Sequence, residues 1–221
     1  MSESITLEPS SPATHSIIWL HGLGAFASDF ANVAQVLDLP SDCAVRHICP
    51  QAPMQSVTLN QGMVMPAWYD LHAIEFSAKE DRWGIQQAFD IVKDLIKQET
   101  KRGISSKNVF IAGFSMGGAL ALYSGLCYHQ PLGGIIALSA YLPLARDFPT
   151  AAKARPDLPI FLGYGTKDDL VLPEWTTAIA TNLAAMGYTA CSIHGYPMGH
   201  MVCGEELRDL SGWLGGVLRK P

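Results

Sequence analysis

Residues 113–118 read Gly-Phe-Ser-Met-Gly-Gly, which places a serine between glycines directly after the apolar run 109–112. A serine on a sharp turn from a strand into a helix presents its hydroxyl at the carboxyl end of a sheet, where it can act as a nucleophile. Gly113 and Gly117 suit such a turn because bulky side chains beside Ser115 would clash. The alternative is a turn serine that only caps a helix, so the rest of the chain must supply the catalytic partners.

A nucleophilic serine needs a base, and the chain has seven histidines. Among them, His200 alone lies between the last expected strand and the last expected helix, next to Gly199, where an imidazole could take the serine proton. His21 also follows a strand and competes for this role. However, His21 precedes Ser115 along the chain. In enzymes with such a serine turn the nucleophile comes first, the acid second and the histidine last, and this order favours His200. His194 falls inside an expected strand and is predicted to be structural or exposed.

The acid that orients the imidazole should follow a strand between Ser115 and His200. Asp168 and Asp169 both lie there, in a turn after the apolar segment 158–164. Either carboxylate could accept the imidazole N–H and stabilise the imidazolium. Periodicity does not choose between adjacent aspartates, and a helix cap with a solvated turn is the alternative for both.

The charge that develops on a substrate oxygen needs two backbone N–H donors. One is expected on Met116, which follows the serine at a helix N-terminus, where free N–H groups and the helix dipole favour negative charge. The other is expected on Leu23, in the glycine-bearing segment His21–Gly24 after the first expected strand. A glycine-rich turn without a catalytic role is the alternative for that segment.

Short apolar strands that alternate with longer helical patterns would position these residues. Strands are expected at 15–20, 43–49, 108–112, 134–139, 158–164 and 190–196, and helices at 28–37, 82–102, 116–128, 173–187 and 201–218. Ser28 with Asp29 should start the first helix, Asp81 should cap the second and Gly103 should end it. Between these elements, residues 50–70 are expected to form a long functional loop with one or two short extended pieces.

This alternation predicts an α/β fold with a mostly parallel central sheet and helices on both faces. Ligands bind at the carboxyl ends of the strands in such sheets, and the candidate residues fall there. With 221 residues, 48% of them hydrophobic, and no break in composition, we expect one domain over residues 1–221.

Composition also limits the classes of function. The net charge of −5 and the scattered basic residues argue against nucleic-acid binding. The polar start of the chain lacks the pattern of a signal peptide, and no apolar run is long enough for stable membrane insertion. Five widely spaced cysteines without a C-x-x-C pair indicate reduced thiols in a cytoplasmic protein, with no metal site.

Five segments together resemble the bacterial carboxylesterase and acyl-protein thioesterase family (phospholipase/carboxylesterase), a family of α/β-hydrolases. They occur in the same order and with similar spacing over nearly the whole chain: His21–Gly24, Ala67–Asp70, Gly113–Gly118, Asp168–Val171 and Tyr196–His200. The resemblance implies hydrolysis of carboxylic esters and thioesters through an acyl-enzyme, without cofactor or metal, often by a homodimer.

The resemblance also assigns residue roles. It implies that Ser115 is the nucleophile, Asp168 rather than Asp169 the acid, and His200 the base. Leu23 and Met116 match the oxyanion donors. Many members of the family carry Gln at the position of Met116; the backbone N–H is the donor, so the chemistry should survive while the pocket wall becomes more apolar.

Apolar side chains near the expected site predict an acyl groove. The candidates are Met63, Val64, Met65 and Trp68 on the long loop, Leu142, Leu144 and Phe148 after another strand, and Leu170, Val171 and Leu172 beside the acid. They predict short to medium acyl chains and broad specificity, with core or loop packing as the alternative for each. Thioesterase action on acylated proteins, lysophospholipase action on lipids, and a non-catalytic binding role on the same fold are the competing functions.

Overall fold

A seven-stranded sheet forms the centre of the computed structural model, which describes residues 4–73, 80–145 and 152–219. The strands lie in the order β1-β3-β2-β6-β7-β8-β9. Their bounds are β1 (Ile5–Leu7), β2 (His15–Leu20), β3 (Val45–Cys49), β6 (Val109–Phe114), β7 (Gly134–Leu138), β8 (Ile160–Gly165) and β9 (Cys191–Tyr196). All neighbouring strands are parallel except β1, which runs antiparallel to β3 at one edge.

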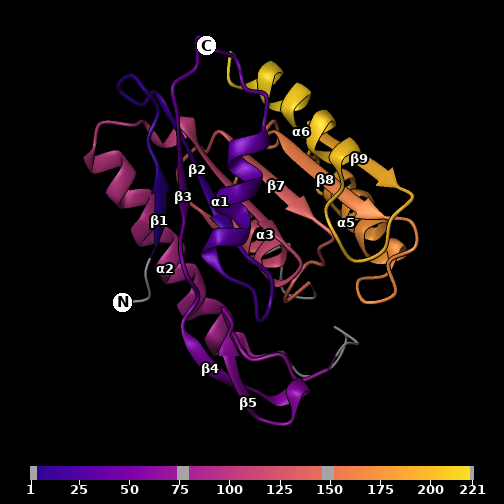
Figure 1. Ribbon diagram of the computed structural model, residues 1–221. Coiled ribbons are helices and arrows are strands. Elements are labelled where there is room, and N and C mark those ends of the chain that lie inside the picture. Colours follow the sequence, from indigo (N-terminus) through magenta and orange to yellow (C-terminus); the bar gives the residue numbers. More distant parts are fainter. Residues whose placement is uncertain (1–3, 74–79, 146–151, 220–221) are drawn as a thin grey trace.

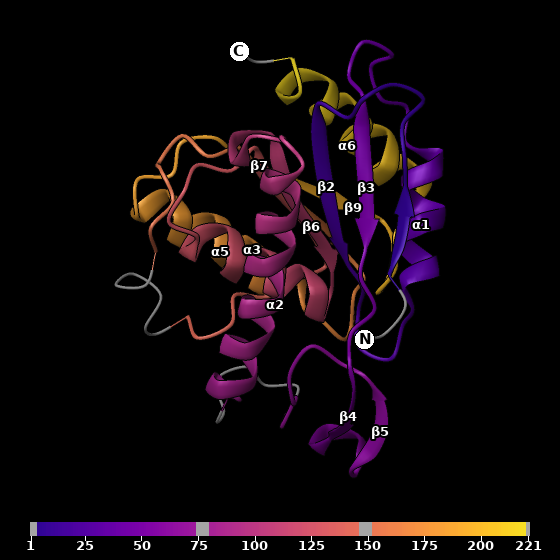
Figure 2. The same cartoon turned by 90° about the vertical axis from the view of Figure 1, so that its left-hand side faces the viewer.

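Helices cover both faces of this sheet. They are α1 (Ala27–Val36), α2 (Arg82–Lys101), α3 (Met116–Cys127), α5 (Pro173–Ala185) and α6 (Gly204–Val217), with short 3₁₀ turns η1 (Thr58–Asn60) and η2 (Ser106–Asn108). Helices α1 and α6 lie on one face, and α2, α3 and α5 lie on the other (Figure 2). The predicted mostly parallel sheet with helices on both faces is therefore confirmed.

The two faces are held by separate apolar layers. The spacing of Ile85, Val92 and Ile96 places these side chains on one buried stripe of α2, as expected of an amphipathic helix. By contrast, α3 is buried along almost its whole length, because it is apolar on all sides and lies between α2 and the sheet. The packing of these two layers holds the strands in place. It therefore also sets the position of the residues that follow each strand.

Local signals set the helix ends. Asp81 caps α2 by accepting a hydrogen bond from the Gly84 N–H at 2.9 Å, and Gly103 follows α2 with a φ of 98°, so the predicted cap and stop are confirmed. The first helix differs from the prediction. It starts at Ala27, and the side chain of Asp29 accepts from the Phe26 N–H at 2.9 Å, so Asp29 rather than Ser28 makes the cap contact.

Two further elements differ from the sequence-based expectation, whereas the extended pieces expected in residues 50–70 are present. Strand β1 was not expected, because it is only three residues long and pairs at the sheet edge within a polar segment. The last helix begins at Gly204 rather than at residue 201. The extended pieces expected in residues 50–70 pair with each other as an antiparallel hairpin, β4 (Met54–Val57) with β5 (Met63–Pro66), which projects from the body of the molecule (Figure 1).

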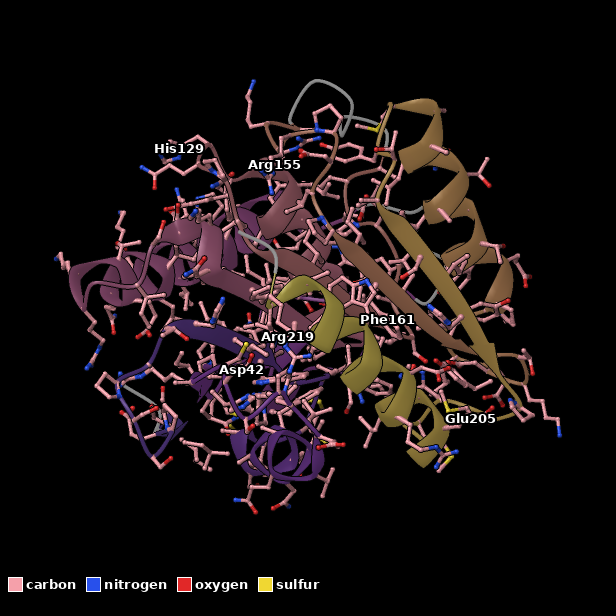
Figure 3. All side chains as sticks on the ribbon, turned by 90° about the horizontal axis from the view of Figure 1, so that it is seen from above. Asp42, His129, Arg155, Phe161, Glu205 and Arg219 are labelled. Atoms are coloured by element: carbon pink, nitrogen blue, oxygen red, sulfur yellow. The ribbon has the colours of Figure 1, made fainter. Side chains whose placement is uncertain are left out.

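The end of α6 is tied back to the sheet region. Arg219, just after α6, donates from Nε and Nη2 to the two carboxylate oxygens of Asp42 at 3.3 and 3.0 Å. Figure 3 shows these two side chains close together. No helix in the described ranges is both long and apolar enough to cross a membrane.

Candidate active site

The turn between β6 and α3 holds Ser115 in a strained conformation. Its φ of 55° and ψ of −121° lie outside the regions that side-chain-bearing residues favour, at a cost of about 1–3 kcal/mol. A Cβ on Gly113 would overlap the Gly117 carbonyl, and one on Gly117 would overlap the Leu20 carbonyl. Both flanking positions therefore require glycine, and the surrounding backbone holds the serine at the carboxyl end of β6.

His200 joins Ser115 to Asp168. Its Nε2 lies 3.0 Å from the Ser115 Oγ, and its Nδ1 lies 2.8 Å from the Asp168 Oδ2. A neutral imidazole that donates from Nδ1 to the carboxylate leaves Nε2 free to accept the serine hydroxyl proton. The phenyl ring of Phe114 lies 4.6 Å from the imidazole, centroid to centroid, and limits its rotation.

The structure separates the two adjacent aspartates. The Asp168 side chain is fully buried, and its Oδ1 accepts from the backbone N–H groups of Leu170 and Val171 at 3.0 and 2.9 Å. Asp169 is exposed. Only Asp168 reaches His200, since the turn after β8 directs that carboxylate inward and fixes it with two backbone donors.

The two expected oxyanion donors, Leu23 and Met116, line the same cavity as Ser115. Leu23 lies in the loop after β2 and Met116 is the first residue of α3, and both line a cavity with the serine. Gly22 places the loop close to the turn: a Cβ there would lie 3.3 Å from the Phe114 Cδ1 and 3.5 Å from the Ser115 Cβ. Among the turns and loops of the described residues, neither the Leu23 nor the Met116 N–H donates to a backbone acceptor.

His21 supports the loop that carries Leu23. The ring is buried; its Nδ1 donates to the Gly22 carbonyl at 2.8 Å, and its Nε2 accepts from the Ala52 N–H at 3.0 Å. Burial lowers the pKa of His21, which favours the neutral form that this bonding requires. With both nitrogens used in this way, His21 has no free ring nitrogen to accept a proton from Ser115.

Trp68 also supports the loop that carries Leu23, through a contact with His21. Its indole N–H donates to the His21 carbonyl at 2.8 Å, and the two rings lie 5.2 Å apart. Trp68 is almost fully buried and is not among the residues that line the Ser115 cavity. Its position therefore differs from the expected acyl contact: it lies beneath the loop because its one polar atom finds its acceptor there.

The Ser115 cavity has a volume of about 290 Å³ and an apolar wall. That wall is formed by Leu59, Leu71, Phe114, Tyr141, Leu170 and Val171. The Leu59 N–H donates to the Leu71 carbonyl at 2.7 Å, which joins the two loop segments of the wall. The Tyr141 hydroxyl lies 2.5 Å from that of Tyr69, and burial raises the pKa of Tyr141, so this part of the wall is neutral.

The expected acyl-groove residues are distributed over several environments. Leu170 and Val171 line the cavity as expected. The others lie elsewhere: Met65 is half-buried beside Gly24, Met63 and Val64 are exposed on β5, Leu142 and Leu144 are buried in the core, and Leu172 precedes α5. Phe148 lies outside the described residues. Sequence reasoning missed Leu59, Leu71 and Tyr141, although the place of Tyr141 just after β7 was a usable signal.

Across residues 4–73, 80–145 and 152–219, no group of three or more His, Cys, Asp or Glu side chains is arranged to hold a metal ion. The polar side chains that meet at Ser115 are instead hydrogen-bonded in an order that would allow proton transfer. Together with an apolar cavity, this arrangement suits nucleophilic attack on a carbonyl carbon that carries an apolar acyl group.

Comparison with known proteins agrees with this geometry. The family model described as phospholipase/carboxylesterase matches residues 1–217. Acyl-protein thioesterase 1 of Mycosarcoma maydis is 37% identical over 220 residues, which cover 93% of this chain and 92% of that protein. Acyl-protein thioesterase 1 of Schizosaccharomyces pombe is 37% identical over 181 residues, covering 81% and 80%.

Solved structures agree as well. The crystal structure of Arabidopsis thaliana SOBER1 has a TM-score of 0.86 and 32% identity, covering 93% of this chain and 99% of that chain. Acyl-protein thioesterase 2 of Zea mays has a TM-score of 0.88 and 29% identity, covering 99% and 100%. The chain therefore belongs to the phospholipase/carboxylesterase family and is a hydrolase with the α/β-hydrolase fold.

Proposed function

We propose that this hydrolase cleaves carboxylic esters through an acyl-enzyme, with Ser115, His200 and Asp168 as its catalytic triad. The observation that carries the proposal is the unbroken chain of contacts from Ser115 Oγ through His200 to Asp168, at 3.0 and 2.8 Å, which opens onto an apolar cavity. A turn serine that merely caps α3 would need none of these partners.

The first step is acylation. Ser115 attacks the acyl carbon while His200 Nε2 takes the hydroxyl proton, and Asp168 holds the imidazole in the required tautomer and stabilises its charge. The Leu23 and Met116 N–H groups bind the oxyanion; loss of one such donor costs about 3 kcal/mol in related chemistry. His200 then gives its proton to the departing alcohol or thiol.

Deacylation repeats these roles with water. His200 removes a proton from the water as it attacks the ester carbon of the acyl-serine, and the same two N–H groups hold the second oxyanion. Collapse of that intermediate breaks the bond to Ser115 Oγ, which regains a proton from His200. The carboxylic acid leaves, and the free serine is restored without any added cofactor.

The cavity wall supports a preference for short to medium acyl chains of varied shape. Leu59, Leu71 and Leu170 come from loops, and apolar contacts of this kind discriminate weakly between similar chains. We therefore expect broad specificity toward small esters and thioesters.

Thioester hydrolysis is the second candidate function. It is favoured by the curated relatives of Mycosarcoma maydis and Schizosaccharomyces pombe, both named acyl-protein thioesterase 1. The same triad would serve it, since only the leaving atom changes from oxygen to sulfur. Lysophospholipase action uses the same groups as well, whereas a non-catalytic binding role leaves the strained Ser115 without a purpose.

A substrate panel tests these alternatives. Rates should be measured on nitrophenyl esters from acetyl to hexanoyl, on an S-acylated peptide and on a lysolipid, with the Ser115→Ala variant as the blank. We expect rates to rise from acetyl to butyl or hexanoyl. A preference for acetyl without any gain at longer chains would contradict the acyl cavity, and equal rates for wild type and Ser115→Ala would contradict catalysis by this site.

We further propose a cytoplasmic location, one domain and a homodimer. The five free cysteines fit a reducing compartment, and the single seven-stranded sheet with a core layer on each face fits one domain. The homodimer rests on the family resemblance alone; light scattering of the purified protein would test it, and a monomer at all concentrations would contradict it.

A further inference from the structure

Glu206, in the first turn of α6, is a fully buried carboxyl group in an apolar setting. Within the described residues, neither of its carboxyl oxygens has a hydrogen-bond partner. The carboxyl occupies the space above Gly163 of β8, where an added Cβ would overlap its Oε1 and contact Leu138. Buried polar groups are nearly always partnered, so this one calls for a functional explanation.

The surroundings of Glu206 favour its neutral form. Burial raises the pKa of Glu206 to about 8. The nearby Cys203 N–H lowers this pKa in part, although it does not form a normal hydrogen bond with the carboxyl group. The helix dipole at the start of α6 also favours a negative charge, yet burial prevails.

Within the described residues, no basic side chain forms a hydrogen bond with Glu206. On β9 it faces Tyr196, whose hydroxyl donates to Asp209 of α6 at 3.0 Å, and at the start of α6 it faces Cys203. On β8 and β7 the neighbours are Gly163 and Leu138, which do not titrate. An ionised Glu206 would therefore be a buried charge without a partner, which is strongly unfavourable.

Glu206 lies between the two segments that carry the acid and the base. Gly163 precedes the turn of Asp168, and α6 follows the loop of His200. That turn and that loop are also bonded to each other, by Thr166 N–H to the Tyr196 carbonyl at 2.7 Å and by Lys167 N–H to the Met198 carbonyl at 3.0 Å. A shift of α6 away from β8 would therefore reach both catalytic groups.

We propose that Glu206 is a positioning residue controlled by its own proton. As a neutral acid it fills the site between α6 and β8 and keeps Asp168 and His200 in register. When it loses the proton, the carboxylate draws in water or moves outward, and the contact between His200 and Asp168 loosens. Loss of activity at alkaline pH is then built into the fold.

The main experiment compares Glu206→Gln with Glu205→Gln. Glutamine has the shape of the neutral acid and cannot ionise, while Glu205 is an exposed neighbour in the same turn, labelled in Figure 3 at the end of α6 opposite Arg219. We expect kcat/KM of wild type and Glu205→Gln to fall above a pH of about 8, by up to about tenfold per pH unit, and Glu206→Gln to stay level. The same alkaline fall in Glu206→Gln would overturn the proposal.

Two further readouts do not depend on the proposed function, whereas the kinetic one does. Infrared spectroscopy of the wild type at neutral pH should show a protonated-carboxyl band that disappears with a midpoint at a pH of about 8. The band should be missing in Glu206→Gln. Its absence from the wild type would overturn the proposal even if the variant failed to fold or the protein had no esterase activity.

Thermal unfolding provides the third readout. The pKa of Glu206 is raised from 4.5 to about 8 in the folded chain, so between these values the folded state holds a proton that the unfolded state has released. Wild-type stability should therefore fall relative to Glu206→Gln as the pH rises through this window, and then level off. A difference in Tm that does not change with pH would contradict the proposal.

Discussion

The groups that would perform the chemistry and the wall that would receive the acyl chain are built in different ways. Ser115, His200 and Asp168 follow three strands of one sheet, and backbone contacts hold the first and the last: Ser115 N–H donates to the Leu138 carbonyl at 2.9 Å, and two backbone N–H groups bind Asp168. The wall is formed largely by side chains from segments between the sheet strands, such as Leu59 and Leu71, which present apolar surface to the cavity.

This difference predicts two kinds of response to substitution. At the strand ends, each group makes specific hydrogen bonds that set its orientation, so removing a group should stop a step of the reaction. In the wall, several side chains share one apolar surface, so removing one should change rates by small factors and mainly for longer acyl chains.

The largest effect should come from Asp168→Asn, which keeps the shape of the side chain but allows the wrong imidazole tautomer. We expect kcat on a butyl ester to fall by about 10⁴-fold, as in related triads. Asp169→Asn is the matched control, because that side chain is exposed and has no contact with His200 in the described structure; it should retain activity within a few-fold. The reverse result would move the acid by one residue.

An intermediate effect should come from His21, through the loop that it supports. His21→Asn removes the acceptor for the Ala52 N–H and should misplace the Leu23 N–H, lowering kcat by about 10²–10³-fold with a smaller change in KM. Steady-state kinetics and thermal unfolding should be measured together.

His47 provides the control for His21. It is also buried, and its Nδ1 accepts from the Trp19 indole N–H at 3.0 Å, in the core layer on the opposite side of the sheet from α2. His47→Asn should lower the Tm and leave kcat nearly unchanged. Equal losses of kcat in both variants would mean that His21 contributes only to stability. The position of the Leu23 N–H would then not depend on His21.

The stability of the folded chain at acidic pH should depend on the buried His47. Burial lowers the pKa of His47 from 6.5 to about 4, so the unfolded chain binds a proton there that the folded chain does not. The sign of the linkage means that stability falls as the pH drops from 6.5 to 4, by up to about 3 kcal/mol. Urea titrations across this window should show a shallower fall in His47→Gln; an unchanged fall would assign the acid sensitivity to other groups.

The smallest effect should come from the wall. Leu59→Ala should lower kcat/KM for a hexanoyl ester by about threefold to tenfold and leave the acetyl ester nearly unchanged, since only the longer chain reaches the removed contact. Met63→Ala is the control, because this exposed methionine of β5 is not among the cavity residues. A loss as large as that of Asp168→Asn would break the contrast between the two regions.

The same contrast explains what the sequence could predict. Ser115, Asp168 and His200 come just after strands whose apolar runs are easy to recognise, and parallel strands deliver such residues to one edge. The short strand β1 and the pairing of β4 with β5 have weak local signals, because three or four residues do not establish a period.

The wall was harder to predict for a physical reason. Leu59, in the short turn η1, lines the cavity, and Val64, on the four-residue strand β5, is exposed. Neither element is long enough to show a period, so nothing local distinguishes the two residues. Trp68 was expected to contact substrate, but its indole N–H found an acceptor in the His21 carbonyl beneath the loop. That partner is set by tertiary packing and not by sequence spacing.

The assignment of Ser115 as the nucleophile can be tested directly with a covalent probe. The purified protein should be treated with a fluorophosphonate, which forms a covalent adduct with an activated serine, and the modified residue should be located by peptide mass spectrometry. We predict one adduct, on Ser115, and none in Ser115→Ala. An adduct on a different residue, or labelling that persists in the variant, would contradict the account.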